Sequence, residues 1–108
     1  MPKGEWLGEF EVCVLLAVEH LGDEAYGLEV GRHLETRIGR RVAIGAVYNT
    51  LARLREKGLL AAQEHAPRPV QGGRRRTAFR LTPPGQRALT FSTSVLSRLI
   101  ADRKSTRS

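Results

Sequence analysis

The apolar positions of this chain recur at helical spacing, most clearly in residues 44–60, IGAVYNTLARLREKGLL. Val47, Leu51 and Leu54 stand at i, i+4 and i+7, which places them on one face of a helix. Gly58 follows the last of these turns, and glycine commonly ends a helix in the left-handed conformation. The pattern predicts one short helix that Gly58 closes and a strand follows.

The polar positions of the same helix form a second stripe, made of a small residue, an amide and two cations: Ala46, Asn49, Arg53 and Lys57. At about 100° per residue they lie roughly opposite the apolar face. A small residue permits close approach to a DNA groove, asparagine can read adenine, and arginine can read guanine or bind phosphate. The stripe fits a DNA-recognition surface, although an ordinary solvated helix face carries the same residue types.

A first helix is predicted for residues 5–21, with Leu7, Phe10 and Val14 on one stripe. Its middle, residues 12–18, is apolar almost all the way round, whereas a surface helix has one apolar face. Two interpretations stay open. The helix is either the centre of the core, or it packs a second apolar face on a partner chain, most simply in a homodimer.

A second helix is predicted for residues 24–37, with Asp23 as its N-cap and Gly39 at its end. Gly27 and Gly31 weaken this helix but allow a neighbouring helix to approach closely. The second helix, the turn after it and the 44–57 helix have the proportions of a helix-turn-helix.

Two strand-like segments, residues 59–65 and 76–82, enclose the sequence APRPVQGGRRR. Its prolines, adjacent glycines and consecutive arginines do not suit a packed core, so this segment is predicted to be a basic hairpin tip. After a helix-turn-helix, such a hairpin is typical of a wing. The wing would lay Arg74, Arg75 and Arg76 on the phosphate backbone or in the minor groove, and the alternative is a solvated charged loop.

The last helix is predicted to begin at Thr82-Pro83-Pro84 and to run to about Arg103. Its apolar seam is short and interrupted by serines, so it would be marginal alone and is expected to pack on the first helix of the same or another chain. The predicted dimer interface consists of Leu7, Phe10, Val14, Leu89, Leu96, Leu99 and Ile100.

The composition fits one folded domain of 108 residues, of which 41% are apolar. The longest apolar run, residues 12–18, is too short to cross a bilayer, and the N-terminus does not resemble a secretory signal. Cys13 is the only cysteine, so no internal disulfide can form. We therefore expect a cytoplasmic protein without a membrane partner, in which Cys13 is a small core residue rather than a redox sensor.

The charge is distributed unevenly along the chain, which carries a net +7. Residues 1–35 hold two Lys or Arg against eight Asp or Glu, a net of −6, whereas residues 36–108 hold sixteen against three, a net of +13. Such a division indicates a polyanion-binding surface on an acidic scaffold, with a merely basic soluble domain as the alternative.

Signals of an enzyme or a cofactor are absent from the sequence. His20, His33 and His65 are scattered without a second ligand at metal spacing, and GGRRRT lacks the Lys-Ser/Thr ending of a P-loop. No nucleophile elbow is present either. We expect neither catalysis nor a metal or cofactor. Trp6 and Phe91 could line an apolar ligand pocket between subunits, but core or interface packing is the simpler interpretation.

Three segments together resemble the PadR family of bacterial winged-helix transcriptional regulators, over about residues 8–90. GEFEVCVLLAV with LGDEAYGLEV is similar to the first two helices of that family, including the Tyr26-Gly27 pair. IGAVYNTLARLREKGLL resembles its recognition helix, and GGRRRTAFRLTPPGQRAL its wing and the entry to its C-terminal helix. The resemblance implies a homodimer built from the first and last helices that represses a nearby gene, relieved in some members by a small aromatic or drug-like effector.

The sequence thus predicts a mainly α fold with a small β-hairpin. A winged helix-turn-helix would span residues 1–82, a dimerisation helix residues 83–104, and a disordered tail residues 105–108. The predicted function is sequence-specific binding of double-stranded DNA by a homodimeric repressor; an RNA-binding protein and a protein-interaction adaptor are the alternatives. The predicted DNA-binding residues are Arg40, Arg41, Ala46, Tyr48, Asn49, Arg53, Lys57, Arg74, Arg75 and Arg76.

Overall fold

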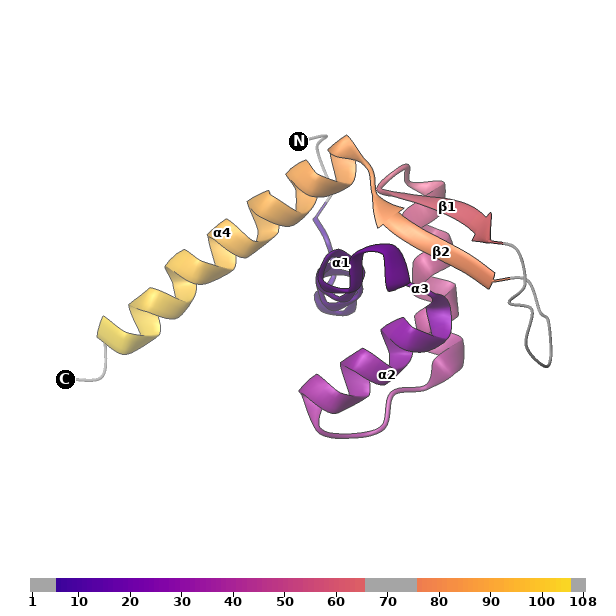
Figure 1. Ribbon diagram of the computed structural model, residues 1–108. Helices are drawn as coiled ribbons and strands as arrows, with labels where there is room; N and C mark the ends of the chain where they lie inside the picture. Colours follow the sequence, from indigo (N-terminus) through magenta and orange to yellow (C-terminus); the bar gives the residue numbers. More distant parts are fainter. Residues whose placement is uncertain (1–5, 66–75, 106–108) are drawn as a thin grey trace.

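The computed structural model describes residues 6–65 and 76–105 and shows a group of helices with a two-stranded hairpin at one side (Figure 1). In chain order the elements are α1 (Glu9–Leu21), the single 3-10 turn η1 (Gly22–Glu24), α2 (Gly27–Ile38), α3 (Ile44–Glu56), β1 (Leu60–His65), β2 (Arg76–Leu81) and α4 (Pro83–Ser105). The strands are antiparallel, with Leu60 opposite Leu81 and His65 opposite Arg76. The predicted mainly α class with a hairpin is confirmed.

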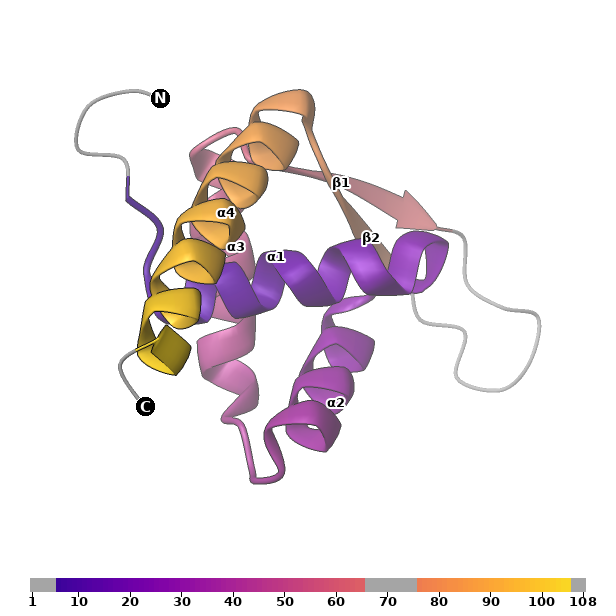
Figure 2. The ribbon, with the colours of Figure 1, turned by 90° about the vertical axis from the view of Figure 1, so that its left-hand side faces the viewer.

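The core is organised around α1, which crosses the middle of the molecule in Figure 2 and contacts α2, α3, α4 and β2. Val14, Leu15 and Val18 of this helix are at most 1% exposed. Val47, Leu51 and Leu54 of α3 are equally buried, which confirms their predicted face. α1 is apolar on almost all sides because it lies at the centre of the molecule, where neighbouring elements cover several of its faces.

Two helix starts differ from the prediction. Residues 6–8 are not helical, and α1 begins at Glu9 after Gly8, whose backbone N–H donates to the Glu11 carboxylate at 2.8 Å. Asp23 does not cap α2: it lies in η1, and Tyr26 occupies the N-cap position. The reason is tertiary, because residues 25–26 pair with the free edge of β2, where the Phe79 N–H donates to the Ala25 carbonyl at 2.9 Å.

The two predicted caps after α3 are confirmed. Gly58 has a φ of +79°, and its N–H donates to the Arg55 carbonyl at 2.9 Å, while the Leu59 N–H reaches the Leu54 carbonyl at 3.0 Å. This pair of bonds is a Schellman motif. Thr82 caps α4, since its hydroxyl accepts the Gly85 N–H at 3.1 Å and donates to the Gly58 carbonyl at 2.6 Å. The end of α3 and the start of α4 are thus tied together.

The two halves of α4 differ in how far the rest of the chain buries their side chains. Ala88, Leu89 and Ser92 are buried against the body of the molecule. Beyond them the helix extends away from the body in Figure 1, and Leu96, Leu99 and Ile100 are 47–56% exposed. Residues 106–108 of the predicted tail lie outside the described residues, and Ser105 belongs to the helix.

Candidate nucleic-acid interface

The outward surface of α3 is exposed along the whole helix. Asn49 lies near its centre, together with three residues spaced at three to four positions: Gly45, Ala52 and Glu56. The predicted stripe of Ala46, Arg53 and Lys57 is also exposed, but it forms the flank next to α1 rather than the middle of this surface. The predicted residues are therefore brought together on one side of α3, off centre.

The flank of α3 next to α1 is organised by Glu11. The Glu11 side chain is 11% exposed, and its Oε2 accepts a hydrogen bond from Lys57 Nζ at 2.9 Å. The same oxygen lies 3.6 Å from Arg53 Nε. Burial alone would raise the pKa of Glu11, but the hydrogen bonds from Gly8 and Lys57 and the charges of Lys57 and Arg53 outweigh it, so the pKa lies below its ordinary value.

The opposite flank of α3 carries Tyr48 and Arg55, which are seven residues apart and both exposed. The Tyr48 ring lies over Gly27, where an added Cβ would come within 2.7 Å of its Cζ. A Cβ on Gly31 would come within 3.1 Å of Ile44 Cδ1. The expectation that these glycines admit a neighbouring helix is thus confirmed. Sequence reasoning missed Arg55, although the helical spacing from Tyr48 would have found it.

The turn between α2 and α3 contains Arg40 and Arg41, both exposed, after Gly39 with a φ of +83°. The Val42 N–H donates to Glu35 Oε2 at 2.9 Å, which fixes the end of this turn against α2. The two arginines consequently stand beside the N-terminus of α3.

The base of the wing is held by an aromatic cluster. His65 ends β1 and is paired with Arg76, which begins β2. The Tyr26 hydroxyl and His65 Nδ1 form a hydrogen bond of 2.8 Å, and the Arg76 guanidinium lies 4.2 Å from the centre of the Tyr26 ring. Arg76 Nε is buried without a hydrogen-bond partner in the described part of the chain. Arg74 and Arg75, predicted at the wing tip, lie outside the described residues.

Two of the three histidines are not scattered in the fold. His20 on α1 and His33 on α2 stack with ring centres 4.6 Å apart. Burial, followed by the nearby His20 and Arg37, lowers the pKa of His33. Among the described residues no group of three His, Cys, Asp or Glu side chains is arranged to hold a metal ion.

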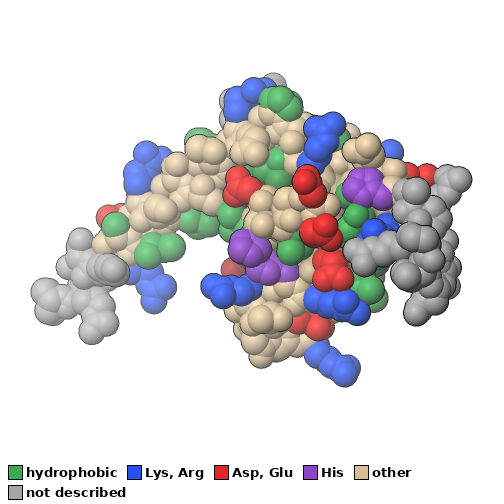
Figure 3. Space-filling model, viewed as in Figure 1, with side chains coloured by type: hydrophobic (Ala, Val, Ile, Leu, Met, Phe, Trp, Pro, Cys, Tyr) green, Lys and Arg blue, Asp and Glu red, His purple; other side chains and the backbone are tan. Residues whose placement is uncertain are grey.

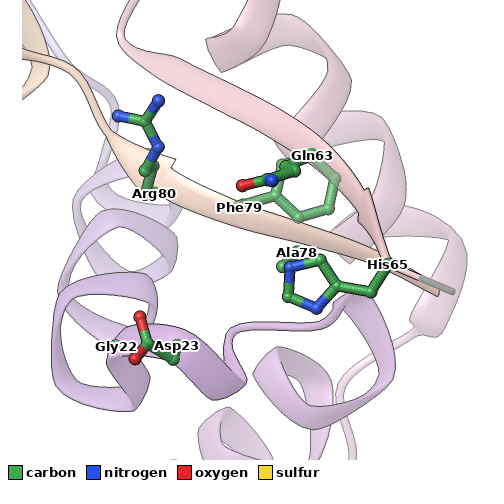
Figure 4. A pocket seen from close by; sticks show the side chains of 7 residues that line it. All are labelled: Gly22, Asp23, Gln63, His65, Ala78, Phe79 and Arg80. Atoms are coloured by element: carbon green, nitrogen blue, oxygen red, sulfur yellow. The ribbon is translucent and has the colours of Figure 1, made fainter.

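Acidic side chains gather over the middle of the face shown in Figure 3, where α1 and α2 lie, and Lys and Arg lie towards its edges. This face also contains a hollow between η1 and the hairpin (Figure 4). Asp23, Gln63 and Arg80 line it, and no residue of α3 does. The hollow therefore lies apart from the outward surface of α3.

Residues 14–90 match the model of the transcriptional regulator PadR-like family. The chain belongs to this family. This PadR-like chain is 37% identical over 83 residues to the transcriptional regulator Rv3488 of Mycobacterium tuberculosis, a match that covers 76% of this chain and 73% of the relative.

Solved structures of PadR-like regulators share the fold. One from Bacillus cereus superposes with a TM-score of 0.74 at 21% identity, covering 90% of this chain and 89% of its own. One from Clostridium difficile gives 0.73 at 20% identity, covering 94% and 100%. The helix-turn-helix, the hairpin and the start of α4 are thus the winged helix of a transcriptional regulator. None of the helices in the described part of the chain is long and apolar enough to span a membrane.

The residues predicted for a dimer interface differ in how far their own chain buries them. Val14 and Leu89 are 0% and 3% exposed within the chain itself, so they belong to its own core and are removed from the proposed interface. Leu7 and Phe10 are partly buried against the core. Trp6 packs on Phe91 within the chain, with ring centres 5.4 Å apart, while remaining 67% exposed.

Proposed function

We propose that this PadR-like regulator binds double-stranded DNA sequence-specifically as a homodimer and represses transcription. The observation that carries the proposal is the outward surface of α3, where Asn49 stands exposed between Arg53 and Arg55. An amide flanked by two guanidinium groups suits the donor and acceptor pattern of the major groove. A winged helix places such a helix in that groove and its wing beside it.

The roles follow from chemistry and position. Asn49 and Arg53 read base edges, and Ala46 allows the helix to approach. Phosphates are held by residues around the helix and in the wing: Tyr48, Arg40, Arg41, Lys57, Arg74, Arg75 and Arg76, to which the exposed Arg55 is added. Dimer symmetry would place half-sites about 10 bp apart, centre to centre.

The homodimer is proposed from the far half of α4. Leu96, Leu99 and Ile100 form an apolar stripe that the chain itself leaves 47–56% exposed. A helix of this kind gains most of its stability from packing, and a second copy offers the same stripe. Phe10, in the first turn of α1, and Leu7, just before this helix, would extend this surface. A small apolar or aromatic effector between subunits would relieve repression.

Selection of bound duplexes from a random pool tests this function. We expect a two-fold symmetric site, and fluorescence anisotropy should show at least roughly 1,000-fold tighter binding to it than to a scrambled duplex. Asn49→Ala should lower affinity for the selected site by about 5- to 150-fold. Arg80→Ala serves as the matched control because Arg80 lines the hollow away from α3.

Three outcomes would overturn the proposal. Equal binding to the selected and scrambled duplexes would exclude sequence-specific recognition. Preference for RNA of equal length in competition would favour an RNA-binding protein. Failure to bind any duplex at low salt would favour a protein-interaction adaptor.

A further inference from the structure

Glu11 links the start of α1 to two cations of α3 across some forty residues of sequence. Figure 2 shows α1 crossing α3, and the short contacts between Glu11 and Lys57 place them side by side. The two carboxylate oxygens have different partners. Oε1 accepts the Gly8 N–H, whereas Oε2 faces Lys57 Nζ and Arg53 Nε.

The contact with Arg53 involves only one edge of its guanidinium. Arginine has five N–H donors, one on Nε and four on the two terminal nitrogens. Glu11 faces Nε at 3.6 Å, and the Arg53 side chain remains 53% exposed. The terminal nitrogens are the ones that form a bidentate pair with guanine O6 and N7. An ion pair at Nε restricts rotation of the side chain without using that pair of nitrogens.

The contact with Lys57 has the opposite consequence. Lys57 Nζ lies 2.9 Å from the nearly buried carboxylate, and its side chain is 33% exposed. Its charge is thus largely balanced inside the protein. A cation so engaged is less available to replace counterions on a phosphate backbone, which is the interaction that every DNA sequence offers equally.

We propose that Glu11 is a positioning residue for sequence discrimination: it holds Arg53 by Nε so that its terminal nitrogens face a base, and it weakens the contact of Lys57 with phosphates. The inference rests on the proposed DNA-binding function and deepens it. Glu11 itself touches no base. Its effect passes through the two cations, so it changes the ratio of specific to non-specific affinity more than either affinity alone.

The test compares Glu11→Gln with Glu19→Gln, an exposed carboxylate on the same helix. Both variants change the net charge equally, and the amide introduced by Glu11→Gln retains an oxygen for the Gly8 N–H. For Glu11→Gln we expect the specific-to-scrambled affinity ratio to fall about 10-fold, of the order of one base contact. Affinity for the scrambled duplex should rise, and its salt slope should steepen by about 0.9 for each phosphate gained. Glu19→Gln should leave the ratio and slope unchanged.

A double-mutant cycle separates positioning from simple stabilisation. In an Arg53→Ala background, Glu11→Gln should change the affinity ratio much less than it does in the wild type, because only the part of the effect that passes through Lys57 remains. Arg53→Lys, which keeps the charge but lacks Nε and the fork, should lose discrimination with Glu11 intact, even if Glu11→Gln proves too unstable to assay.

The outcomes distinguish this inference from the function on which it rests. If the wild-type chain does not discriminate between duplexes, the proposed function fails and this inference with it. If the wild type discriminates but Glu11→Gln behaves like Glu19→Gln, or lowers both affinities equally, only the positioning role is overturned. A change of ratio that is as large in the Arg53→Ala background as in the wild type would also overturn it.

Discussion

Two arginines of the proposed DNA surface are held in physically different ways. Arg53 on α3 faces a nearly buried carboxylate, that of Glu11, through Nε. Arg76, at the start of β2, lies over the Tyr26 ring, and its Nε is buried without a hydrogen-bond partner in the described segments. The first contact partly balances the charge of the arginine, whereas the ring in the second contact supplies no counter-charge.

The two contacts therefore have different effects on a guanidinium group: one mainly orients its donors, and the other mainly preserves its positive charge. An ion pair at one edge of a guanidinium fixes the direction of the remaining donors, which favours the recognition of a particular base. A ring face holds the guanidinium plane but supplies no counter-charge, which favours attraction to phosphate. We therefore expect the α1 flank of α3 to contribute mainly to specificity and the wing base mainly to affinity.

The largest expected effect comes from removing the ring beneath Arg76. Tyr26 is 8% exposed and contacts both His65 and Arg76, so Tyr26→Ala should lower the free energy of unfolding by about 3 kcal/mol or more. Tyr26→Phe keeps the ring and loses only the hydrogen bond to His65, so it should cost about 1 kcal/mol. Urea unfolding measures both. A Tyr26→Ala cost as small as that of Tyr26→Phe would show that the ring does not hold the wing base.

The next effect compares the two arginines directly on DNA. Arg53→Ala should lower affinity for the selected duplex by about 1–3 kcal/mol and change affinity for a scrambled duplex little. Arg76→Ala should lower both affinities to a similar extent. Anisotropy titrations of the two variants on both duplexes provide the measurement. If Arg53→Ala reduces both affinities equally, the proposed difference between the two arginines is wrong, and Arg53 contacts the DNA backbone rather than a base.

A smaller effect concerns the salt dependence of binding. If Arg76 neutralises one phosphate, Arg76→Ala should reduce the slope of log affinity against log salt by about 0.9. Replacing Arg74, Arg75 and Arg76 together should flatten the slope further, which tests the predicted wing tip. The measurement is a series of titrations at several salt concentrations. An unchanged slope in the triple variant would remove the wing from the interface.

The parts of the fold that the sequence predicted depend on local signals. Gly58 ends α3 and Thr82 begins α4 because each motif is complete within a few neighbouring residues. The start of α2 was missed because residues 25–26 pair with β2, which lies some fifty residues further along the chain. No local pattern around Asp23 reports that pairing.

The site was predictable only to the same degree. The helical pattern identified the exposed cations of α3, but it could not reveal Glu11 or Tyr26 as partners of the surface arginines, because each contact joins distant segments. The sequence pattern of an apolar stripe likewise does not distinguish burial in the core of the same chain from burial against a partner chain. For this reason Val14 and Leu89 were assigned to a partner chain although their own chain buries them.

The smallest expected effect is the pH dependence of the Glu11 contacts. Because the fold lowers the pKa of Glu11, its charged form stabilises the native state at neutral pH, and this contribution is lost as the pH falls through the lowered pKa. The difference in unfolding free energy between the wild type and Glu11→Gln should therefore be largest near pH 7, at about 1 kcal/mol, and should shrink in acid. Lys57→Met should reduce this pH dependence, since it removes the 2.9 Å partner of Oε2. A difference that stays constant between about pH 7 and pH 3 would mean that Glu11 acts by its shape and not by its charge, and the contrast with Arg76, which lies over an uncharged ring, would then disappear.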